Sequence, residues 1–588
     1  MFLQRLLGVA ASLSSLAAVS ARLPDGRPNG NVMRPATVPM VPVPDPGTPV
    51  TSRNGTVLPP YTTTYYFDQL IDHNNPSLGT FKQRYWHTWE FYEQGGPIIL
   101  MTPGEGNAQG YSGYLTNRTI NGQIAQQQNG AAIVLEHRFY GLSNPYPDLS
   151  VKSLKVHTIQ QAIDDFEYFA KNVNLPMPGG DSVTPDKAPW ILVGGSYSGA
   201  LTSWIMVNKP GLFFAGYASS AVVEAILDFW QYFEPIRLNM PANCSADVQA
   251  VIAHVDKTFS GKNQTAIQQL KENFGLGNMT HLDDVAGALR NNMWDWQSLQ
   301  VTSGPGTQFY KFCDALEVKD GVQAPASGFG LEHALSAWGA YWRSYYLGNL
   351  CGAVDAETCL GTYDASADFY TNTTIDNASR SWMWIVCNEV GYLQEGAPLG
   401  HPTLVSRLVQ PPYDLRQCRL MFPGAFNILS VPNTLRTNVK YKGWNVRIKN
   451  LFFANGIRTY LFFLFLLLYL NSKSTKPTPK THPGDPWKDA TVSAAGINVP
   501  STDSQPIGLG DGFHCSDLST SGAIDLTILA VQKKALGYMK KWLATWKPST
   551  NPSKPVKTPK PTPQGLAKLV ASPFVKPVNA WFRGAGVA

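Results

Sequence analysis

The stretch that decides the fold is APWILVGGSYSGALTSWIMV, residues 188–207. Its first part, residues 188–193, is apolar and predicts a short buried strand, and residues 200–207 predict the start of a helix. The turn between them, Gly194–Gly199, is built mainly of small residues. A serine on a tight turn between strand and helix presents its hydroxyl above the edge of a sheet, as in a nucleophile elbow. The stretch therefore predicts a catalytic serine, and a glycine-rich turn without chemistry is the alternative.

Two serines of this turn compete for the role. The elbow pattern G-x-S-x-G, started at Gly194, makes Ser196 the nucleophile and places Ser198 where the second glycine is expected. Ser198 fits the role less well, because Ser196 would then occupy the first glycine position. We assign the nucleophile to Ser196. The backbone N–H of Tyr197 is then the expected first donor of an oxyanion hole, and Gly104, in a turn after an early strand, is the candidate second donor.

Strands and helices alternate around the turn. Short apolar runs predict buried strands, and an apolar pattern with helical spacing covers residues 158–172. The predicted strands are residues 79–86, 97–101, 131–135, 190–193, 213–219, 444–446 and 450–455, and a last helix is predicted at 524–546. This alternation is typical of a mostly parallel sheet with helices on both faces. We therefore predict an α/β-hydrolase fold.

A helical insertion interrupts the predicted sheet. Between residues 224 and 439 short helical segments dominate and tryptophans are frequent, so we expect a cap domain whose tryptophans mostly belong to its core. The hydrolase domain then comprises residues 61–223 and 440–546. Residues 22–60, rich in Pro, Gly, Asn and Thr, predict a flexible leader or pro-segment, and the Pro- and Lys-rich residues 547–588 predict a disordered tail.

Several features predict secretion. Residues 1–21 combine a basic Arg5, an apolar run and small residues before a cleavage site, as a secretory signal peptide does. Seven N-glycosylation sequons follow, at Asn54, Asn117, Asn243, Asn263, Asn278, Asn372 and Asn377. The seven cysteines should mostly pair in an oxidising compartment and leave at least one unpaired. We expect an extracellular protein, with the vacuolar or lysosomal lumen as the alternative.

The net charge of +6 does not indicate a nucleic-acid partner. The basic excess lies in two peripheral segments, residues 457–484 and 547–588, and the remainder is net acidic. No Cys or His cluster has the spacing of a zinc site, so we expect neither a metal nor another cofactor. The apolar run within 457–484 is short of the ~20 residues that span a membrane, so we expect no stable membrane insertion.

A serine nucleophile needs a histidine base and a carboxylate that holds the histidine's tautomer. In this fold the acid follows a late strand and the histidine precedes the last helix. His514 lies in a glycine-rich loop just before the predicted last helix, whereas His401 and His482 lack that context. Position favours Asp485 as the acid, with competitors at Asp489, Asp503 and Asp511.

Together these segments resemble the lysosomal Pro-X carboxypeptidase family of serine peptidases, which includes dipeptidyl peptidase II and the fungal acid prolyl endopeptidases. The matching pieces occur in family order between residues 61 and 546. They are Phe67–His73, Gly79–Tyr85, Gly104-Glu105-Gly106, Glu136–Gly141, Gly194–Gly199, Trp384, Cys387, Glu389, Asp485-Pro486-Trp487 and Gly512-Phe513-His514. Ser198 in place of glycine is similar to the fungal branch.

The resemblance implies a Ser196–Asp485–His514 triad that cleaves peptides or proteins on the carboxyl side of proline. It also implies Trp487 as a wall of an apolar proline pocket and Glu105 as a substrate-binding residue. Endopeptidase, carboxypeptidase and dipeptidyl peptidase action stay open, although the fungal branch favours endopeptidase or broad post-proline action. A secreted esterase or lipase on the same fold is the alternative function.

Residues 457–484 depart from the family pattern. In the family Asp-Pro-Trp follows the Asn-Gly strand end after two residues, whereas here a long apolar and then Pro/Lys-rich stretch separates Gly456 from Asp485. Exposed beside a catalytic site, the apolar run would be an aggregation liability. We interpret the stretch as translated intron. A genuine insert would predict a catalytically impaired protein, because a ~1 Å misplacement of catalytic groups costs ~100-fold in rate.

Overall fold

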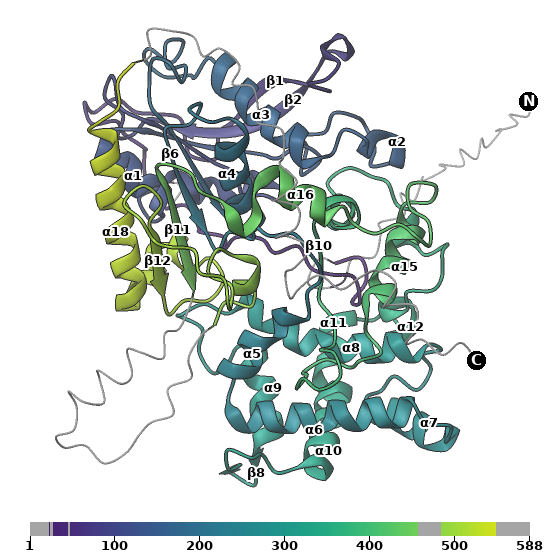
Figure 1. The fold of residues 1–588 in the computed structure, drawn as a ribbon. Coiled ribbons are helices and arrows are strands. Elements are labelled where there is room, and N and C mark those ends of the chain that lie inside the picture. The colour runs from purple at the N-terminus through teal and green to yellow at the C-terminus, as the bar shows by residue number, and fades with distance from the viewer. Residues whose placement is uncertain (1–22, 24–26, 45–46, 457–483, 549–588) are drawn as a thin grey trace, which may run out of the picture.

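The computed structural model describes residues 23, 27–44, 47–456 and 484–548. At its centre lies an eight-stranded sheet with the order β1-β2-β4-β3-β5-β6-β11-β12 (Figure 1). The strands are β1 (Thr64–Leu70), β2 (Thr80–Thr88), β3 (Ile98–Met101), β4 (Ala131–Leu135), β5 (Trp190–Gly195), β6 (Ala215–Ser219), β11 (Leu451–Gly456) and β12 (Ile507–Gly510). β2 pairs antiparallel with both β1 and β4, and all the remaining pairs are parallel. The mostly parallel sheet predicted from the sequence is confirmed.

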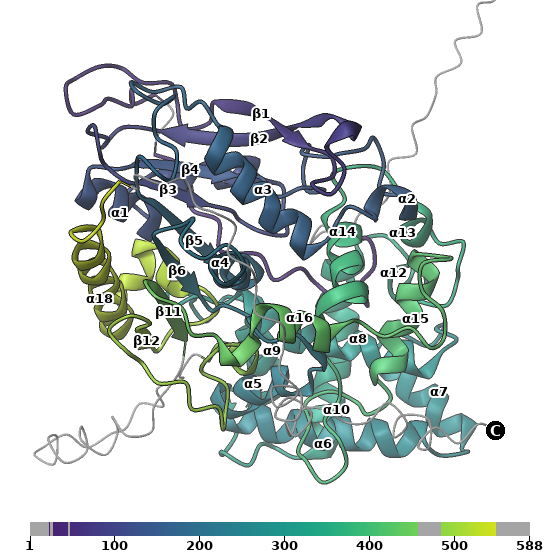
Figure 2. The same cartoon turned by 45° about the horizontal axis from the view of Figure 1, so that its top comes forward.

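Helices cover both faces of this sheet (Figure 2). On one face α4 (Ser196–Asn208) packs against α3 (Ile159–Asn172) and α16 (Thr434–Tyr441). On the other face α1 (Ile120–Gln128) packs against α18 (Leu526–Leu543). β3, β4 and β5 are buried at every position, as expected for parallel strands covered on both sides. The architecture is the predicted α/β-hydrolase fold.

The insertion between β6 and α16 is a layer of helices beside the sheet domain (Figure 1). Its helices are α5 (Phe233–Asn239), α6 (Ala242–Phe259), α7 (Gln264–Asn273), α8 (Leu282–Trp294), α9 (Gln308–Glu317), α10 (Leu331–Tyr341), α11 (Leu347–Cys351), α12 (Ala356–Leu360), α13 (Asp368–Thr371), α14 (Ala378–Ile385) and α15 (Pro411–Met421). A two-stranded parallel ladder, β7 (Ile226–Asp228) with β10 (Gly391–Leu393), joins this layer. Its tryptophans at 294, 296, 338, 342 and 382 are buried, as predicted for core residues.

The disulfides of the described residues all lie in this helical layer. They join Cys244 to Cys313, Cys351 to Cys359, and Cys387 to Cys418. Cys515 is unpaired and buried. The sequence predicted that most cysteines pair and at least one stays single, but it did not give the connectivity.

One strand prediction was wrong, and two strands of the sheet, β1 and β12, were not predicted. Residues 444–446 are not a strand, because Gly443–Asn445 form a 3₁₀ turn in which the Trp444 N–H donates to Glu224 Oε2 at 2.9 Å. The sequence of β12 alternates Ile and Leu with glycine, and glycine weakens the strand signal.

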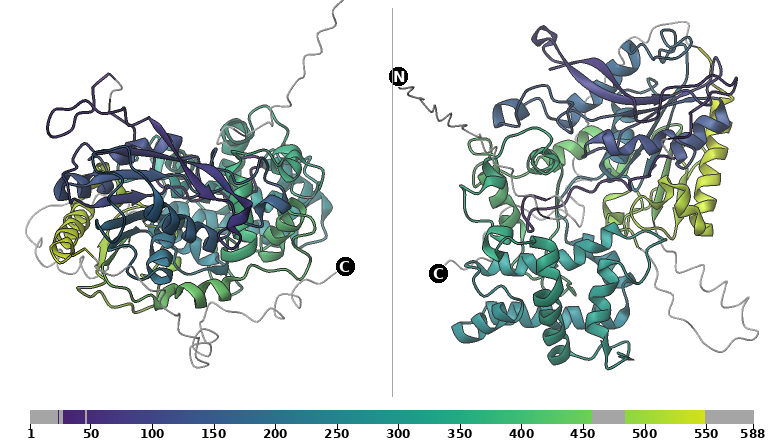
Figure 3. Two further views of the ribbon diagram at one scale, coloured as in Figure 1. Left: turned by 90° about the horizontal axis from the view of Figure 1, so that it is seen from above. Right: turned by 180° about the vertical axis from the view of Figure 1, so that it is seen from behind.

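The flexible leader or pro-segment predicted for residues 22–60 is partly buried where the structure describes it. Residues 27–44, which we call the strap, run between the sheet domain and the helical layer (Figure 3, right). Val32, Met33 and Val38 expose 2% of their surface or less. The Pro- and Asn-rich composition is typical of a free chain, but these spaced apolar side chains bury against the two domains.

Several predictions fall outside the described residues. These are the signal peptide at 1–21, nearly all of the insert at 457–484, and the tail beyond residue 548. Within the described ranges, no helix combines the length and apolar character needed to cross a bilayer.

Buried ion pairs explain part of the sequence pattern around Glu136. The guanidinium of Arg84, on β2, donates to Glu136 through Nε (2.9 Å) and Nη2 (2.6 Å). Glu136 Oε1 also accepts the Ala108 N–H at 2.9 Å, just after the Gly104–Gly106 turn. Since the same carboxylate holds β2 and this turn, we assign Glu136 a structural role in fixing the turn beside the elbow.

Candidate active site

Ser196 stands where β5 ends and α4 begins. Its φ is +58°, in the left-handed region that residues other than glycine rarely occupy. Strain of this kind is typical of functional turns, and of the nucleophile elbow in particular. The Ser196 Oγ is buried and has no hydrogen-bond partner among the described residues. The backbone therefore positions the hydroxyl, and no hydrogen bond within the described residues engages it.

Ser198 explains the departure from G-x-S-x-G. Its Oγ accepts the Gly195 N–H at 3.0 Å and donates to the Gly195 carbonyl at 2.7 Å. The hydroxyl thus braces the residue that directly precedes Ser196. Gly194 is needed for close packing, because a Cβ there would lie 2.1 Å from the Ser198 carbonyl oxygen. The Ser198 hydroxyl is therefore part of the turn, whereas the Ser196 hydroxyl has no such contact among the described residues.

His514 and Asp485 are brought together by the fold. His514 Nδ1 lies 2.9 Å from Asp485 Oδ1, and both side chains are almost fully buried. The same oxygen accepts the Trp487 N–H at 2.9 Å. His514 Nε2 has no hydrogen-bond partner among the described residues. An Nδ1–H donated to the carboxylate leaves Nε2 as the free base, which is the tautomer that a triad requires.

The competing residues lie elsewhere. Asp489 accepts the Ala495 N–H, and Asp503 is exposed and pairs with Lys541. His401 packs on Trp230 with ring centroids 4.9 Å apart. His482 is outside the described residues. Among the predicted acids, Asp485 is the one whose carboxylate contacts the His514 ring.

The histidine loop lies against the elbow. A Cβ at Gly195 would lie 2.9 Å from Cys515 Sγ, and the Cys515 N–H donates to Ser220 Oγ at 3.1 Å. Gly195 and Ser219 are paired in the sheet, at the carboxyl ends of β5 and β6. The residues next to Ser196 and next to His514 are therefore in contact at the same sheet edge.

Asp517 fixes this loop, and sequence reasoning missed it. Its carboxylate accepts the Tyr217 hydroxyl at 2.5 Å and the Ser219 hydroxyl at 2.8 Å, both from β6. Burial raises the pKa of Asp517 to about 6, while the two hydroxyl donors oppose that rise. The residue type and its place after His514 were visible, but its partners, some 300 residues away in the chain, were not.

The groups around His514 raise the pKa of its imidazole. Burial lowers the pKa of the imidazole, while Cys515 and the Asp485 carboxylate beside it raise the pKa by more, so that it lies above its usual range. The carboxylate favours the protonated ring that forms when a base takes up a proton.

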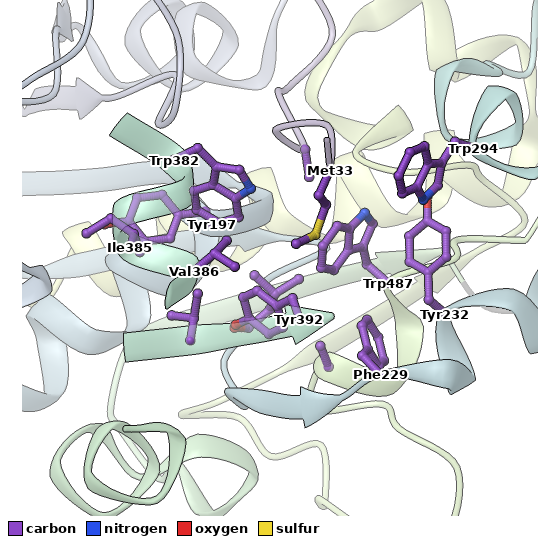
Figure 4. Packing of buried hydrophobic residues seen from close by; sticks show 14 of the residues in the cluster. Met33, Tyr197, Phe229, Tyr232, Trp294, Trp382, Ile385, Val386, Tyr392 and Trp487 are labelled. Atoms are coloured by element: carbon purple, nitrogen blue, oxygen red, sulfur yellow. The ribbon is translucent and has the colours of Figure 1, made fainter. Parts of the chain in front are cut away.

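Trp487 lies in a group of buried aromatic side chains (Figure 4). Its ring centroid lies 6.0 Å from that of His514. The rings around it belong to Phe229 at 5.6 Å, Tyr232 at 5.3 Å and Tyr392 at 5.4 Å. The indole N–H donates to Gln297 Oε1 at 2.7 Å, and the Tyr232 hydroxyl donates to the same oxygen at 2.9 Å. Gln297, which sequence reasoning also missed, thus holds both the Trp487 and the Tyr232 side chains in place.

The Gly104 turn lies beside the elbow. Gly104 has φ +84°, and a Cβ there would lie 3.3 Å from Ser198 Cβ. Its N–H donates to Thr102 Oγ1 at 3.3 Å, a long contact. Glu105 is fully buried, and burial raises the pKa of its carboxyl to about 8, opposed by its own backbone amide, by His514 and by the Ala36 amide. Neither carboxyl oxygen has a partner with hydrogen-bonding geometry among the described residues.

The predicted glycosylation asparagines differ in exposure. Asn54, Asn117, Asn263 and Asn278 are exposed, and Asn372 and Asn377 are partly buried. Asn243 is buried, and its Nδ2 donates to the Ala324 carbonyl at 3.4 Å. We expect glycans at the exposed sites first.

Known proteins resemble this chain over most of its length. The family model described as "Serine carboxypeptidase S28" matches residues 69–458, more than half of the chain. The "Serine protease vicPb" of Bipolaris victoriae is 32% identical over 498 residues, which cover 81% of this chain and 88% of that protein. The chain belongs to the serine carboxypeptidase S28 family. It is therefore a serine-type peptidase, and the family resemblance predicted from its segments is confirmed.

Two further relatives show the breadth of this S28 similarity. The "Probable extracellular serine carboxypeptidase" of Arthroderma benhamiae is 32% identical over 498 residues, covering 79% of this chain and 64% of that protein. The human "Thymus-specific serine protease" is 26% identical over 405 residues, covering 66% and 75% respectively. The S28 match ends at residue 458, just after β11 and before the Asp485 and His514 loops.

Proposed function

We propose that this S28 peptidase is secreted and hydrolyses peptide bonds on the carboxyl side of proline through Ser196, His514 and Asp485. The observation that carries the proposal is the 2.9 Å contact between His514 Nδ1 and Asp485 Oδ1, made beside the elbow and near the Trp487 ring. His514 Nε2 and Ser196 Oγ both lack a hydrogen-bond partner among the described residues.

The reaction follows from these groups. His514 Nε2 takes the Ser196 hydroxyl proton while Oγ attacks the peptide carbonyl carbon, and Asp485 stabilises the imidazolium that forms. The Tyr197 N–H, in the first turn of α4, donates to the carbonyl oxygen as it becomes negative. Gly104 supplies the second N–H by exchanging its long contact with Thr102. The imidazolium then protonates the leaving amine, and water hydrolyses the acyl-enzyme by the same steps.

An aromatic pocket suits proline. A proline ring carries no charge and no N–H when it lies within a chain, so recognition rests on apolar contact. The ring centroids of Phe229 and Tyr392 lie 5.6 and 5.4 Å from that of Trp487, which lies 6.0 Å from that of His514. Glu105 borders the same site as a carboxyl held neutral by burial at acidic pH, and we propose that it contacts the substrate.

Secretion has independent support. Disulfides, such as that between Cys387 and Cys418, form and persist in oxidising compartments. The signal-like residues 1–21 and the sequons agree with export. One relative is named as extracellular. The lumen of a vacuole or lysosome offers the same conditions and is the alternative location.

The proposal is tested with paired substrates. End-blocked peptides with an internal Pro or Ala, free-ended peptides and a short acyl ester are compared on the purified enzyme. We expect a large preference for Pro, which Trp487→Leu reduces by at least ~10-fold in the Pro/Ala ratio of kcat/KM. Trp338→Leu is the matched control, because Trp338 is buried in the helical layer against Asn292. Ester turnover without peptide turnover would contradict the peptidase mechanism.

We also propose that residues 457–484 are translated intron. The residues on either side of the stretch lie together, since a Cβ at Gly456 would be 3.2 Å from Asp485 Cβ. A two-residue link can therefore join β11 to the acid loop without moving the site. Sequencing the mature transcript decides this: we expect it to lack most of the stretch, and a transcript that encodes all of it contradicts the interpretation.

A further inference from the structure

The strap, residues 27–44, is bound tightly to the helical layer. The Gly30 N–H donates to the Cys359 carbonyl at 2.8 Å. The Asn31 side chain donates to the carbonyls of Asp284 (2.9 Å) and Leu360 (2.7 Å). Arg27 donates to Asn291 Oδ1 at 2.7 Å. Buried polar contacts of this kind fix a chain in one register.

The other end of the strap is held by the hydrolase domain, close to the nucleophile. The hydroxyls of Tyr114 and Tyr111 donate to the carbonyls of Pro39 (2.7 Å) and Val38 (3.3 Å). A Cβ at Gly195 would lie 2.8 Å from Val38 Cγ1. Val38 therefore packs on the residue directly before Ser196.

Between these anchors the strap crosses the candidate active site. The Ala36 amide approaches the Glu105 carboxyl closely enough to oppose the rise of its pKa. Met33 belongs to the same buried cluster as Trp487, and Figure 4 shows its thioether directed toward that ring. A thioether beside an aromatic ring makes a favourable contact. The strap thus places one apolar side chain in the aromatic pocket and covers the elbow with the residues that follow.

The catalytic groups are closed off in this state. Ser196 is fully buried, His514 exposes 2% of its surface and Trp487 exposes 1%. A peptide substrate must reach all three, so something has to leave before chemistry begins. Near its C-terminal end the strap carries an exposed proline, Pro42, and Pro49 beyond the strap is also exposed.

We propose that the strap is a covalently attached inhibitor, with Met33 in the pocket that the substrate's proline would occupy, and that a second enzyme copy releases it by cleaving after Pro42 or Pro49. Cleavage adds one water across the peptide bond and leaves a carboxylate on the proline and an amine on the next residue. Because the strap blocks its own site, the cleavage is made in trans by a copy that has already lost its strap. The inference rests on the proposed function for the identity of the pocket and for the cleavage after proline.

The test measures nucleophile access and peptide hydrolysis separately. A specific protease site replaces the exposed residues 47–49, and the protein is compared before and after cleavage, with intact mass defining the N-terminus. A fluorophosphonate reports Ser196 access, since Oγ displaces fluoride whatever the peptide specificity is. We expect at least 10-fold faster labelling after cleavage. Equal labelling of cut and uncut chains would overturn the proposal.

Variants on the strap sharpen the test. Met33→Asp places a charge in the aromatic pocket and should speed labelling of the uncut chain at least 10-fold. Met40→Asp is the matched control, because Met40 is 68% exposed on the same strap, and it should change nothing. Equal effects of the two substitutions would contradict occupation of the pocket by Met33.

A peptide experiment does not depend on how these variants fold. A synthetic peptide of residues 27–44 should inhibit the processed enzyme competitively, and its Met33→Asp form should bind at least 10-fold more weakly. Absence of inhibition by the unmodified peptide would overturn the proposal. Faster labelling after cleavage without turnover of proline peptides would sustain the latency and contradict the proposed specificity. Equal turnover of proline peptides by cut and uncut chains would contradict the latency and agree with the proposed specificity.

The cleavage step has its own test. Ser196→Ala protein carrying the native linker should remain unprocessed when expressed alone, and it should lose the strap when active enzyme is added. Mass spectrometry should find the new N-terminus after Pro42 or Pro49. A terminus elsewhere, or processing of the Ser196→Ala protein alone, would contradict self-processing in trans.

Discussion

The two sides of the candidate active site are held in different ways. Ser196 is positioned by its own neighbours in the chain, β5, α4 and the Ser198 hydroxyl. His514 and Asp485 lie on loops that distant elements fix: Asp517 binds β6, and the Trp296 indole N–H donates to the Gly484 carbonyl at 2.7 Å. The candidate nucleophile is thus positioned by its neighbours in the chain, whereas the candidate base and acid come together only in the finished fold.

The largest loss of activity should come from substituting Ser196, the residue positioned by its own neighbours in the chain. Ser196→Ala should lower kcat by about 10⁶-fold, because the triad acts as a unit. Its thermal stability should stay close to that of the parent, since Ser196 Oγ makes no hydrogen bond among the described residues. Ser198→Ala is the matched control: it keeps the nucleophile but loses two contacts with Gly195, worth about 1 kcal/mol each. Equal loss of activity in the two variants would argue against our choice of serine.

Substituting Asp485, which lies on a loop fixed by distant elements, should lower activity almost as strongly. Asp485→Asn should lower kcat by about 10⁴-fold, because the amide stabilises the wrong tautomer of His514. Asp489→Asn alters a nearby buried carboxylate that accepts the Ala495 N–H, and it should cost far less activity. Steady-state kinetics on one proline peptide measure both. A similar loss in the two variants would mean that Asp485 acts only through the shape of its loop.

Asp517 tests whether the base is positioned from outside the triad. Asp517→Asn should weaken the contacts with Tyr217 and Ser219 and lower kcat by about 10- to 100-fold with little change in KM, because His514 shifts relative to Ser196. Tyr217→Phe removes one of the two contacts and should have a smaller effect in the same direction. A rise in KM at constant kcat would assign Asp517 to substrate binding.

These differences mirror what was predictable from the sequence. The elbow, the parallel strands and the α3 pattern are local signals, and Ser196 follows from them alone. His514 followed from its position before the last helix. Asp485 needed the family resemblance to stand out from Asp489, Asp503 and Asp511, because spacing does not reveal which carboxylate reaches a ring. Gln297, Asp517 and the strap were missed because their roles depend on contacts between segments far apart in the chain.

The smallest predicted effect is on the way the stability of the folded protein depends on pH. Burial raises the pKa of Glu224 to about 8 and of Glu389 to about 7, while the hydrogen bonds to Glu224 from Trp444 and Asn438 and that to Glu389 from Ile159 oppose the rise. Their folded-state pKa values exceed the unfolded value of about 4.5, so the folded chain binds more protons between the two values. Stability should therefore be greatest at acidic pH and fall as pH rises from about 4.5 to 8. Urea unfolding midpoints at pH 5 and pH 8 measure this, and Glu389→Gln should reduce the difference. Greater stability at pH 8 would contradict neutral carboxyls at these positions.

The most direct measurement of the central claim is the site and rate of fluorophosphonate labelling in the N-terminally processed enzyme. Peptide mass mapping should find the adduct on Ser196, and His514→Ala should slow its formation by at least 10³-fold, because no base then takes the hydroxyl proton. An adduct on Ser198 or on another serine, or a rate unchanged by His514→Ala, would contradict a nucleophile encoded by the elbow and activated by the distant histidine.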